Sequence, residues 1–235
     1  IPRLTSGATV GFVAEGAVIP EDGVAFDEVK LMPSSRKSLK VIVTVTNELV
    51  RQSVVGIDGV LKTRLVTDVA NALDTALLTG TGASDTVTGI INQAGVTTGA
   101  LDPADPDSIL DGIAAARADN VEPNRIFMSG ADFATMSKLK EGTASKRYLL
   151  EANIHAGPTY SFAGIPLVVT NKLPVGKTVI ADTSQIAVAQ DVAPSVAIDT
   201  GGSYFASDLT AFRVVARYDL GLLHPEGVVV LTDTP

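Results

Sequence analysis

The sequence predicts an α+β fold, and three patterns along its 235 residues carry this prediction. Residues 38–46 (SLKVIVTVT) alternate between two faces, which is typical of a strand with one buried face. Residues 58–78 repeat apolar side chains every three or four positions, which is typical of an amphipathic helix. Short apolar runs in the C-terminal half predict further strands.

The first part of the chain predicts a projecting ribbon that leads into a buried strand. Residues 12–22 (FVAEGAVIPED) begin like a strand and then place Val18 and Ile19 among acidic residues, as at the tip of a hairpin. Residues 24–32 have strand composition with charges on both faces, which suits a ribbon better than a core strand. The buried face of the following strand is predicted to hold Leu39, Val41, Val43 and Val45.

Two helices and a glycine-rich tract are expected next. A short helix should run from residue 47 to about residue 53, with Thr46 or Asn47 as its cap. The long helix should end at Gly80, and TGTGAS after it is expected to be a flexible linker. The apolar stripe of the long helix comprises Val60, Leu61, Leu65, Val69, Leu73 and Leu77, widened by Val66, Ala70 and Ala76.

The second half mixes short helices and strands. Helices are predicted at 107–118 and 131–140, a loop at 141–158, and a break at Gly201–Gly202. Strands are predicted at 125–128, 165–170, 177–181, 185–189, 195–198, 211–218 and 227–231.

Composition excludes several classes of function. The absence of cysteine rules out a disulfide scaffold and a Cys nucleophile. A net charge of −8 without a basic run argues against a nucleic-acid-binding protein. There is no apolar run of the roughly 18 residues that a membrane span needs. The start, IPRLTSG, lacks a Met and a signal sequence, so the chain is interpreted as lacking its front, by processing or by disorder.

Catalytic, cofactor and metal sites are not expected. His155 and His224 both lie in predicted loops or turns without an evident partner, and Ser129 suits a helix N-cap. TGTGAS follows a helix and lacks the lysine of a phosphate-binding loop. Three acids, Asp102, Asp105 and Asp107, are interpreted as charges at a helix start, because they lack the spacing of a calcium loop.

The order of several weak motifs resembles the phage major capsid protein family, with its Hong Kong 97-type fold. Members carry V-A-E-G-x-x-I-P, then S/T-N-E-L, then a helix ending in L-x-G-x-G, then P-T-G-I-L-N, and three later motifs. Nearly the whole chain takes part, through residues 13–20, 46–49, 77–82, 88–92, 128–140 and 162–174 and the closing segment FRVVARYDLGLLHPEGVVVL.

The resemblance implies a shell subunit with four named parts. Residues 1–35 would form the E-loop, a hairpin that lies over a neighbouring subunit. Residues 36–103 and 201–235 would form the peripheral domain, with its spine helix at about 58–78, and residues 104–200 the axial domain. The family's N-terminal arm is expected to precede Ile1. The contact between subunits is expected at the E-loop tip, at Glu15, Val18, Ile19, Pro20 and Glu21.

Some relatives join their subunits by a Lys–Asn isopeptide bond with a Glu as base, and this chain departs from that pattern. Ile19 takes the place of the Lys, residues 207–210 offer no Asn, and Ala216 lies where the Glu is expected. The resemblance therefore predicts a shell without an autocatalytic cross-link.

The implied function is a major capsid protein that assembles into pentamers and hexamers of an icosahedral shell around double-stranded DNA. An acidic subunit suits a shell that must not grip its genome. Scaffold, portal and decoration proteins are the possible partners, and assembly would occur in the bacterial cytoplasm. Alternatives are a prophage or gene-transfer-agent capsid, an encapsulin-type compartment and, more remotely, a hydrolase or a monomeric binding module.

Overall fold

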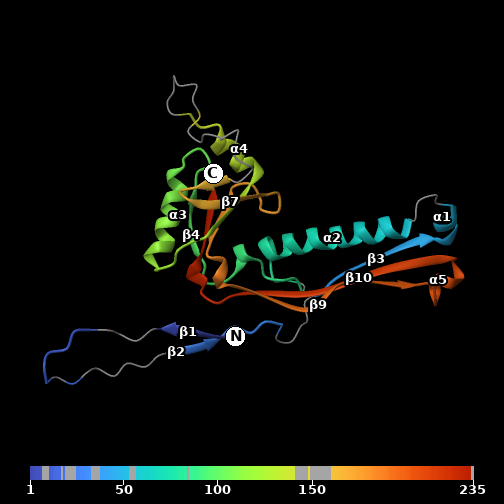
Figure 1. Cartoon of the computed structure of the whole chain (residues 1–235), viewed down its shortest axis with the longest axis horizontal. Helices are drawn as coiled ribbons and strands as arrows, with labels where there is room; N and C mark the ends of the chain where they lie inside the picture. The colour runs from blue at the N-terminus through green and yellow to red at the C-terminus, as the bar shows by residue number, and fades with distance from the viewer. Residues whose placement is uncertain are drawn as a thin grey trace.

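The chain folds into a body and two extensions that leave it in opposite directions (Figure 1). This computed structural model describes residues 1–6, 11–16, 18, 25–32, 38–52, 57–83, 85–140, 148 and 160–233. The described strands form three sheets, of two, three and six strands. The predicted α+β class is confirmed, because helices pack on the two larger sheets.

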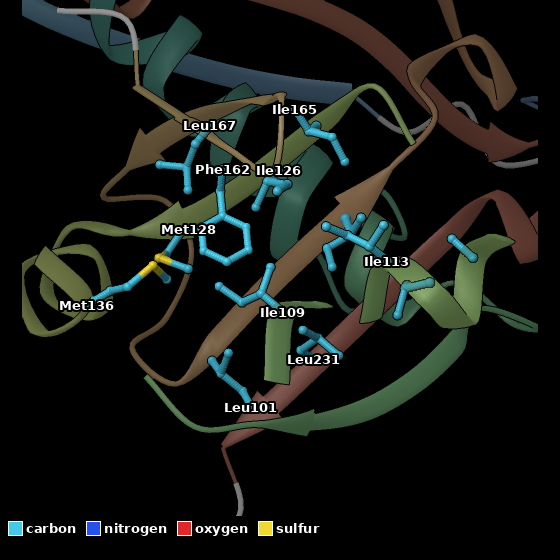
Figure 2. Packing of buried hydrophobic residues seen from close by; sticks show 13 residues of the cluster. Leu101, Ile109, Ile113, Ile126, Met128, Met136, Phe162, Ile165, Leu167 and Leu231 are labelled. Carbon is cyan, nitrogen blue, oxygen red and sulfur yellow. The ribbon is translucent and has the colours of Figure 1, made fainter. Parts of the chain in front are cut away.

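The body is built on the six-stranded mixed sheet. Its strand order is β4 (Thr97–Leu101), β11 (Val228–Asp233), β8 (Lys177–Ala181), β5 (Arg125–Ser129), β7 (Ile165–Thr170) and β6 (Tyr160–Phe162). Helix α3 (Asp107–Ala118) packs on β11 and β4, and α4 (Gly130–Ser137) packs on β5 and β7. Ile109 and Ile113 of α3 meet Met128 and Leu231 of the sheet in a buried core (Figure 2).

One extension is the three-stranded antiparallel sheet with a long helix along it. Its strands are β3 (Ser38–Thr46), β10 (Leu209–Leu222) and β9 (Ile186–Asp199), and the helix is α2 (Ile57–Thr79). Leu65 and Val69 of α2 pack with Phe212 and Val214 of β10 in a second core. The other extension is the hairpin of β1 (Pro2–Ser6) and β2 (Ala25–Glu28).

Short elements complete the described chain. They are α1 (Asn47–Gln52), α5 (Ser203–Ala206) and the 3-10 turns η1 (Ile90–Asn92), η2 (Thr183–Gln185) and η3 (Pro225–Gly227).

Most of the predicted elements are confirmed, some with the predicted bounds. Helix α3 and strands β7 and β8 begin and end where the sequence predicts. The predicted face of β3 is also the buried one, and the Thr46 hydroxyl accepts a hydrogen bond from the N–H of Leu49 at the start of α1. Helix α4 ends at Ser137, three residues early, and the loop predicted at 141–158 lies outside the described residues except for Tyr148.

Two predictions about the chain path are wrong. The strands expected at 185–189 and 195–198 are one continuous strand, β9, which passes Pro194 at a register shift against β10. This is possible because β9 is an edge strand and a bulge needs no N–H from proline. The tract after α2 is also not a free linker, because the N–H of Gly89 bonds to the carbonyl of Gly80 and Thr81 pairs with Thr88.

The sheets do not follow the sequence ranges expected for the domains. Strand β9, from the range 104–200, joins the sheet of β3 and β10. Strands β4 and β11, from the ranges 36–103 and 201–235, join the six-stranded sheet of the body. The assignment of axial and peripheral parts therefore stays a prediction.

Candidate assembly surface

The hairpin exposes large apolar side chains. Phe12 is fully exposed and Val18 is 91% exposed, and Phe26 on β2 is 75% exposed. The chain turns at Glu15 and Gly16, where Gly16 has a φ of +77°, a conformation that favours glycine. Side chains of this size are normally buried, so their grouping on one projection marks a surface for a partner.

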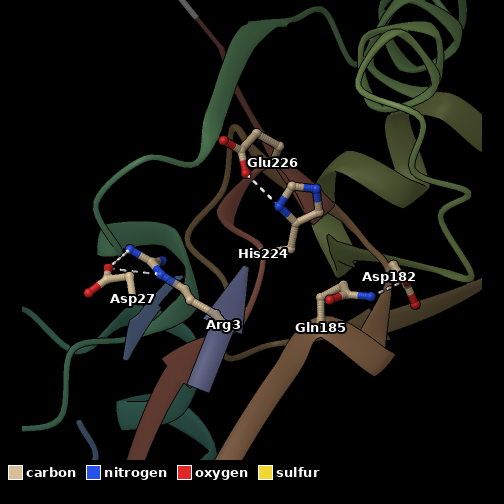
Figure 3. A network of polar contacts seen from close by, with 6 residues as sticks. All are labelled: Arg3, Asp27, Asp182, Gln185, His224 and Glu226. Carbon is tan, nitrogen blue, oxygen red and sulfur yellow. Dashed lines mark hydrogen bonds and ion pairs between the residues drawn. The ribbon is translucent and has the colours of Figure 1, made fainter. Parts of the chain in front are cut away.

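An ion pair joins the two strands of the hairpin (Figure 3). Arg3 and Asp27 are cross-strand partners, and the Arg3 guanidinium donates from Nη2 and Nε to Asp27 Oδ2 at 2.7 and 3.1 Å. The hydrogen bond from Arg3 lowers the pKa of the Asp27 carboxyl below its ordinary value. Because both side chains are partly exposed, the pair stabilises the hairpin only weakly, and its main effect is to fix the register of β1 against β2.

The predicted contact residues fall on this projection where the structure describes them. Glu15 and Val18 are exposed at its turn. Ile19, Pro20 and Glu21 lie outside the described residues.

Phe26 is an exposed apolar residue that the sequence reasoning did not single out. Its signal was present, because it is an aromatic residue directly before the acids Asp27 and Glu28.

A second exposed apolar group lies at the far end of the three-stranded sheet. Phe205 on α5 is 82% exposed, and Leu49 on α1 is half exposed. The N–H of Asn47 donates to the carbonyl of Asp208, which holds the α1 and α5 ends of the sheet together. The sequence predicted only a break at Gly201–Gly202 before α5, and the aromatic pair Tyr204–Phe205 shortly after it was the available signal.

The described candidate catalytic residues lie in a turn and at a helix N-cap. His224 Nδ1 lies 2.8 Å from Glu226 Oε2 on the turn before β11, with both side chains about half exposed (Figure 3). Ser129 is the N-cap of α4, as predicted, because its hydroxyl accepts from the N–H of Asp132. His155 lies outside the described residues.

The acidic residues near α3 support the start of that helix. Asp102 Oδ1 accepts from the N–H of Ala104, and Asp105 Oδ1 accepts from the N–H of Asp107. Among the described residues, His, Asp and Glu side chains form no group of three that could hold a metal ion. No helix in the described part of the chain is both long and apolar enough to cross a membrane.

The positions relevant to a covalent cross-link are also described in part. Ala216 is fully buried on β10 opposite Leu39 of β3. In residues 207–210, the Asp208 carboxylate accepts a hydrogen bond from the Asn47 side chain at 2.6 Å. Ile19 is outside the described residues. The absence of a cross-link stays a prediction.

Comparison with known proteins gives a consistent result. The sequence model described as the Phage capsid family matches residues 1–233. A curated relative, the major capsid protein of Klebsiella oxytoca phage phiKO2, is 24% identical over 99% of this chain, and the chain spans 59% of that relative's length.

Solved structures with the same fold include shell proteins. A capsid chain of a native GTA particle aligns with 100% of this chain and 84% of its own length, with a TM-score of 0.80 and 17% identity. A chain from Gordonia phage Cozz aligns with 100% of this chain and 81% of its own length, with a TM-score of 0.77 and 15% identity. These likenesses establish the Hong Kong 97-type fold predicted from the sequence.

Proposed function

Because the chain belongs to the phage capsid family, we propose that it is a major capsid protein that assembles into pentamers and hexamers of an icosahedral shell. The observation that carries this proposal is the projecting hairpin with exposed Phe12, Val18 and Phe26. A monomer gains nothing from such residues, whereas a shell buries them at each of many repeated contacts.

The tip of the hairpin forms the contact with a neighbouring copy. Its contact residues are Glu15, Val18, Ile19, Pro20 and Glu21, which combine apolar groups with acids. The acids keep the unassembled hairpin in water, and the apolar groups contribute about 25 cal/mol per Å² when a neighbour covers them.

The two larger sheets would correspond to the two domains of the family. The three-stranded sheet with α2 would be the peripheral domain and its spine helix, and the six-stranded sheet with α3 and α4 the axial domain. Support comes from two clusters of buried residues, one on each of these sheets, which a third cluster connects through β10, β8 and β11.

The proposed shell forms a virion, is assembled in the host bacterial cytoplasm and encloses double-stranded DNA without gripping it. The net charge of −8 supports the last point, because a shell that bound phosphates tightly would impede packaging. Scaffold, portal and decoration proteins are partners of the same proposal. The exposed His224–Glu226 pair gives no reason to propose a hydrolase.

A GTA or prophage capsid is the second candidate, and the likeness to the capsid chain of a GTA particle favours it over an encapsulin-type compartment. Electron microscopy of the full-length polypeptide tests the shell proposal. Icosahedral shells, tubes or capsomer rings are expected. A stable monomer under assembly conditions would overturn the proposal. Nucleic acid extracted from purified particles, as a discrete genome or as host fragments, separates a phage from a GTA.

A further inference from the structure

The end of the hairpin is tied to strand β10 of the three-stranded sheet by a buried carboxylate. Asp219 of β10 is only 3% exposed, and its Oδ2 accepts a hydrogen bond of 2.8 Å from the backbone N–H of Met32. Its Oδ1 accepts from the N–H of Leu220 at 3.0 Å. Met32 ends the segment that returns from β2, so this bond joins parts of the chain that are 187 positions apart.

Apolar packing reinforces the same junction. Gly221 follows Asp219 by two positions in β10, so both face the same side of the strand. A methyl group at Gly221 would lie 2.7 Å from Cγ1 of Val29 and 2.8 Å from Cδ2 of Leu31. The side chains of Val29 and Leu31 therefore pack directly against the β10 backbone at Gly221, where a larger residue would have to displace them.

The backbone at the junction is held in an uncommon conformation. Met32 has a φ of +54°, which is left-handed and unfavourable for a long side chain. Such conformations persist where the surrounding contacts impose them, and they gather at switches and functional sites. The bond to Asp219 is a contact of this kind, because it fixes the direction of the Met32 N–H.

The strand itself has no evident need for an acid at this position. Aspartate is depleted in strands, and the next residues of β10, Leu220 and Leu222, are buried and apolar. A buried carboxylate is tolerated only when hydrogen bonds satisfy it, and the hairpin supplies one of them. The bond from Met32 is thus one reason for an acid at position 219.

We propose that Asp219 is a positioning residue that fixes the angle at which the hairpin leaves β10, and that Val29 and Leu31 pack against Gly221 to hold the same angle. Fixing this angle before assembly orients the exposed tip toward a second copy of the chain and lowers the entropy lost on contact. We call the contacts of Asp219 and Gly221 with residues 29–32 the latch. Its purpose rests on the proposed shell function, although the latch itself can be tested on the isolated subunit.

The test uses the full chain with two substitutions. Asp219→Ala removes the hydrogen-bond acceptor, and Gly221→Ala places a methyl group where Val29 and Leu31 pack. Hydrogen exchange is measured at the amides of residues 29–32, together with the melting temperature and the rate of assembly. A hydrogen bond to a charged group is worth at least a factor of about ten in a local opening equilibrium. Exchange at the base should therefore rise about tenfold or more, while exchange in the body core does not change.

Two further variants separate a latch from general destabilisation. Met32→Gly keeps the N–H and relieves the backbone, so it should retain slow exchange at the base. Asp68→Ala removes a carboxylate from the exposed face of α2 and should leave the base unaffected. Exchange that stays slow in Asp219→Ala, or that rises equally in β10, β5 and the hairpin base, would overturn the latch.

The same measurements distinguish the latch from the shell function. If the latch is right and the shell function is wrong, exchange at the base rises in Asp219→Ala but the parent chain never assembles. If the latch is wrong and the shell function is right, the parent chain assembles and Asp219→Ala assembles at the same rate. If both are right, Asp219→Ala folds but assembles several-fold more slowly.

Discussion

Replacing Val18 by aspartate separates the stability of the subunit from its assembly. Val18 is 91% exposed at the hairpin tip, so Val18→Asp should change the free energy of unfolding by no more than about 0.5 kcal/mol. In a shell the same side chain would be covered, and full burial of a valine side chain contributes roughly 1.5–3 kcal/mol. Because 1.4 kcal/mol is about a factor of ten, each contact should weaken by about tenfold to a hundredfold.

The aspartate adds a further penalty, because a buried charge without a partner costs more than the lost apolar area. Val18→Thr is the matched control, since it keeps the shape and adds no charge, and it should assemble more weakly than the parent but better than Val18→Asp. Ile19, outside the described residues, carries the same expectation for Ile19→Asp.

The assay combines thermal unfolding of the subunit with light scattering and electron microscopy of assembly. Unchanged melting with lost or slowed assembly is expected. A melting temperature that falls by more than a few degrees would mean that Val18 belongs to the folded core. Assembly at the parental rate would mean that the tip is not the contact.

The remaining predictions concern single positions and the covalent cross-link. Thr178 is fully buried in β8, and its hydroxyl has no hydrogen-bond partner among the described residues. Thr178→Val should therefore raise the free energy of unfolding by about 1 kcal/mol, measured by denaturant titration. A methyl group at Gly80 would lie 2.1 Å from the carbonyl oxygen of Val87, so Gly80→Ala should cost roughly 3 kcal/mol in the same titration. Gly59→Ala, inside α2, meets open space and should be neutral or stabilising by up to about 1 kcal/mol. Arg3 lowers the pKa of Asp27, so the pair is fully formed above pH 3.8 and is lost only as the pH falls through the lower folded-state value. Carboxyl titration by NMR should show this, and Arg3→Ala should return the Asp27 pKa to its ordinary range. Particles boiled in SDS should run as single subunits, and a ladder of covalent oligomers would refute the prediction of no cross-link.

The helices and central strands could be predicted because local signals and tertiary packing agree there. Asp107 in the first turn of α3 and the apolar spacing of Ile109 and Ile113 both indicate the helix that forms. In β3 the alternation of apolar residues matches the face that α2 covers. Where local preference and burial point to one structure, the sequence alone is sufficient.

The remaining elements depend on partners that are distant in the sequence. Strand β4 has the weak local pattern TTGAL and forms because it pairs in parallel with β11, more than 120 positions later in the chain. Strand β9 continues through Pro194 because β10 accommodates a bulge there. On α2 the predicted stripe was too wide, since Val60 and Val66 remain exposed while Leu65 and Val69 are buried. One sheet face covers only a narrow line along a helix.

The hairpin shows why exposed apolar residues can be predicted from a sequence while their geometry cannot. Phe12 and Phe212 are the same residue type, yet one is fully exposed and the other fully buried. Because Phe12, Val18 and Phe26 are exposed in the folded subunit, we expect changes at these positions to affect association without affecting folding. Asp219 differs from these exposed residues, since it is buried on β10 and its carboxylate binds the backbone at the base of the hairpin. Its role becomes visible only when residues 32 and 219 are seen together. In this chain, substitutions that spare folding but alter assembly should therefore fall at the tip of the hairpin and at its base.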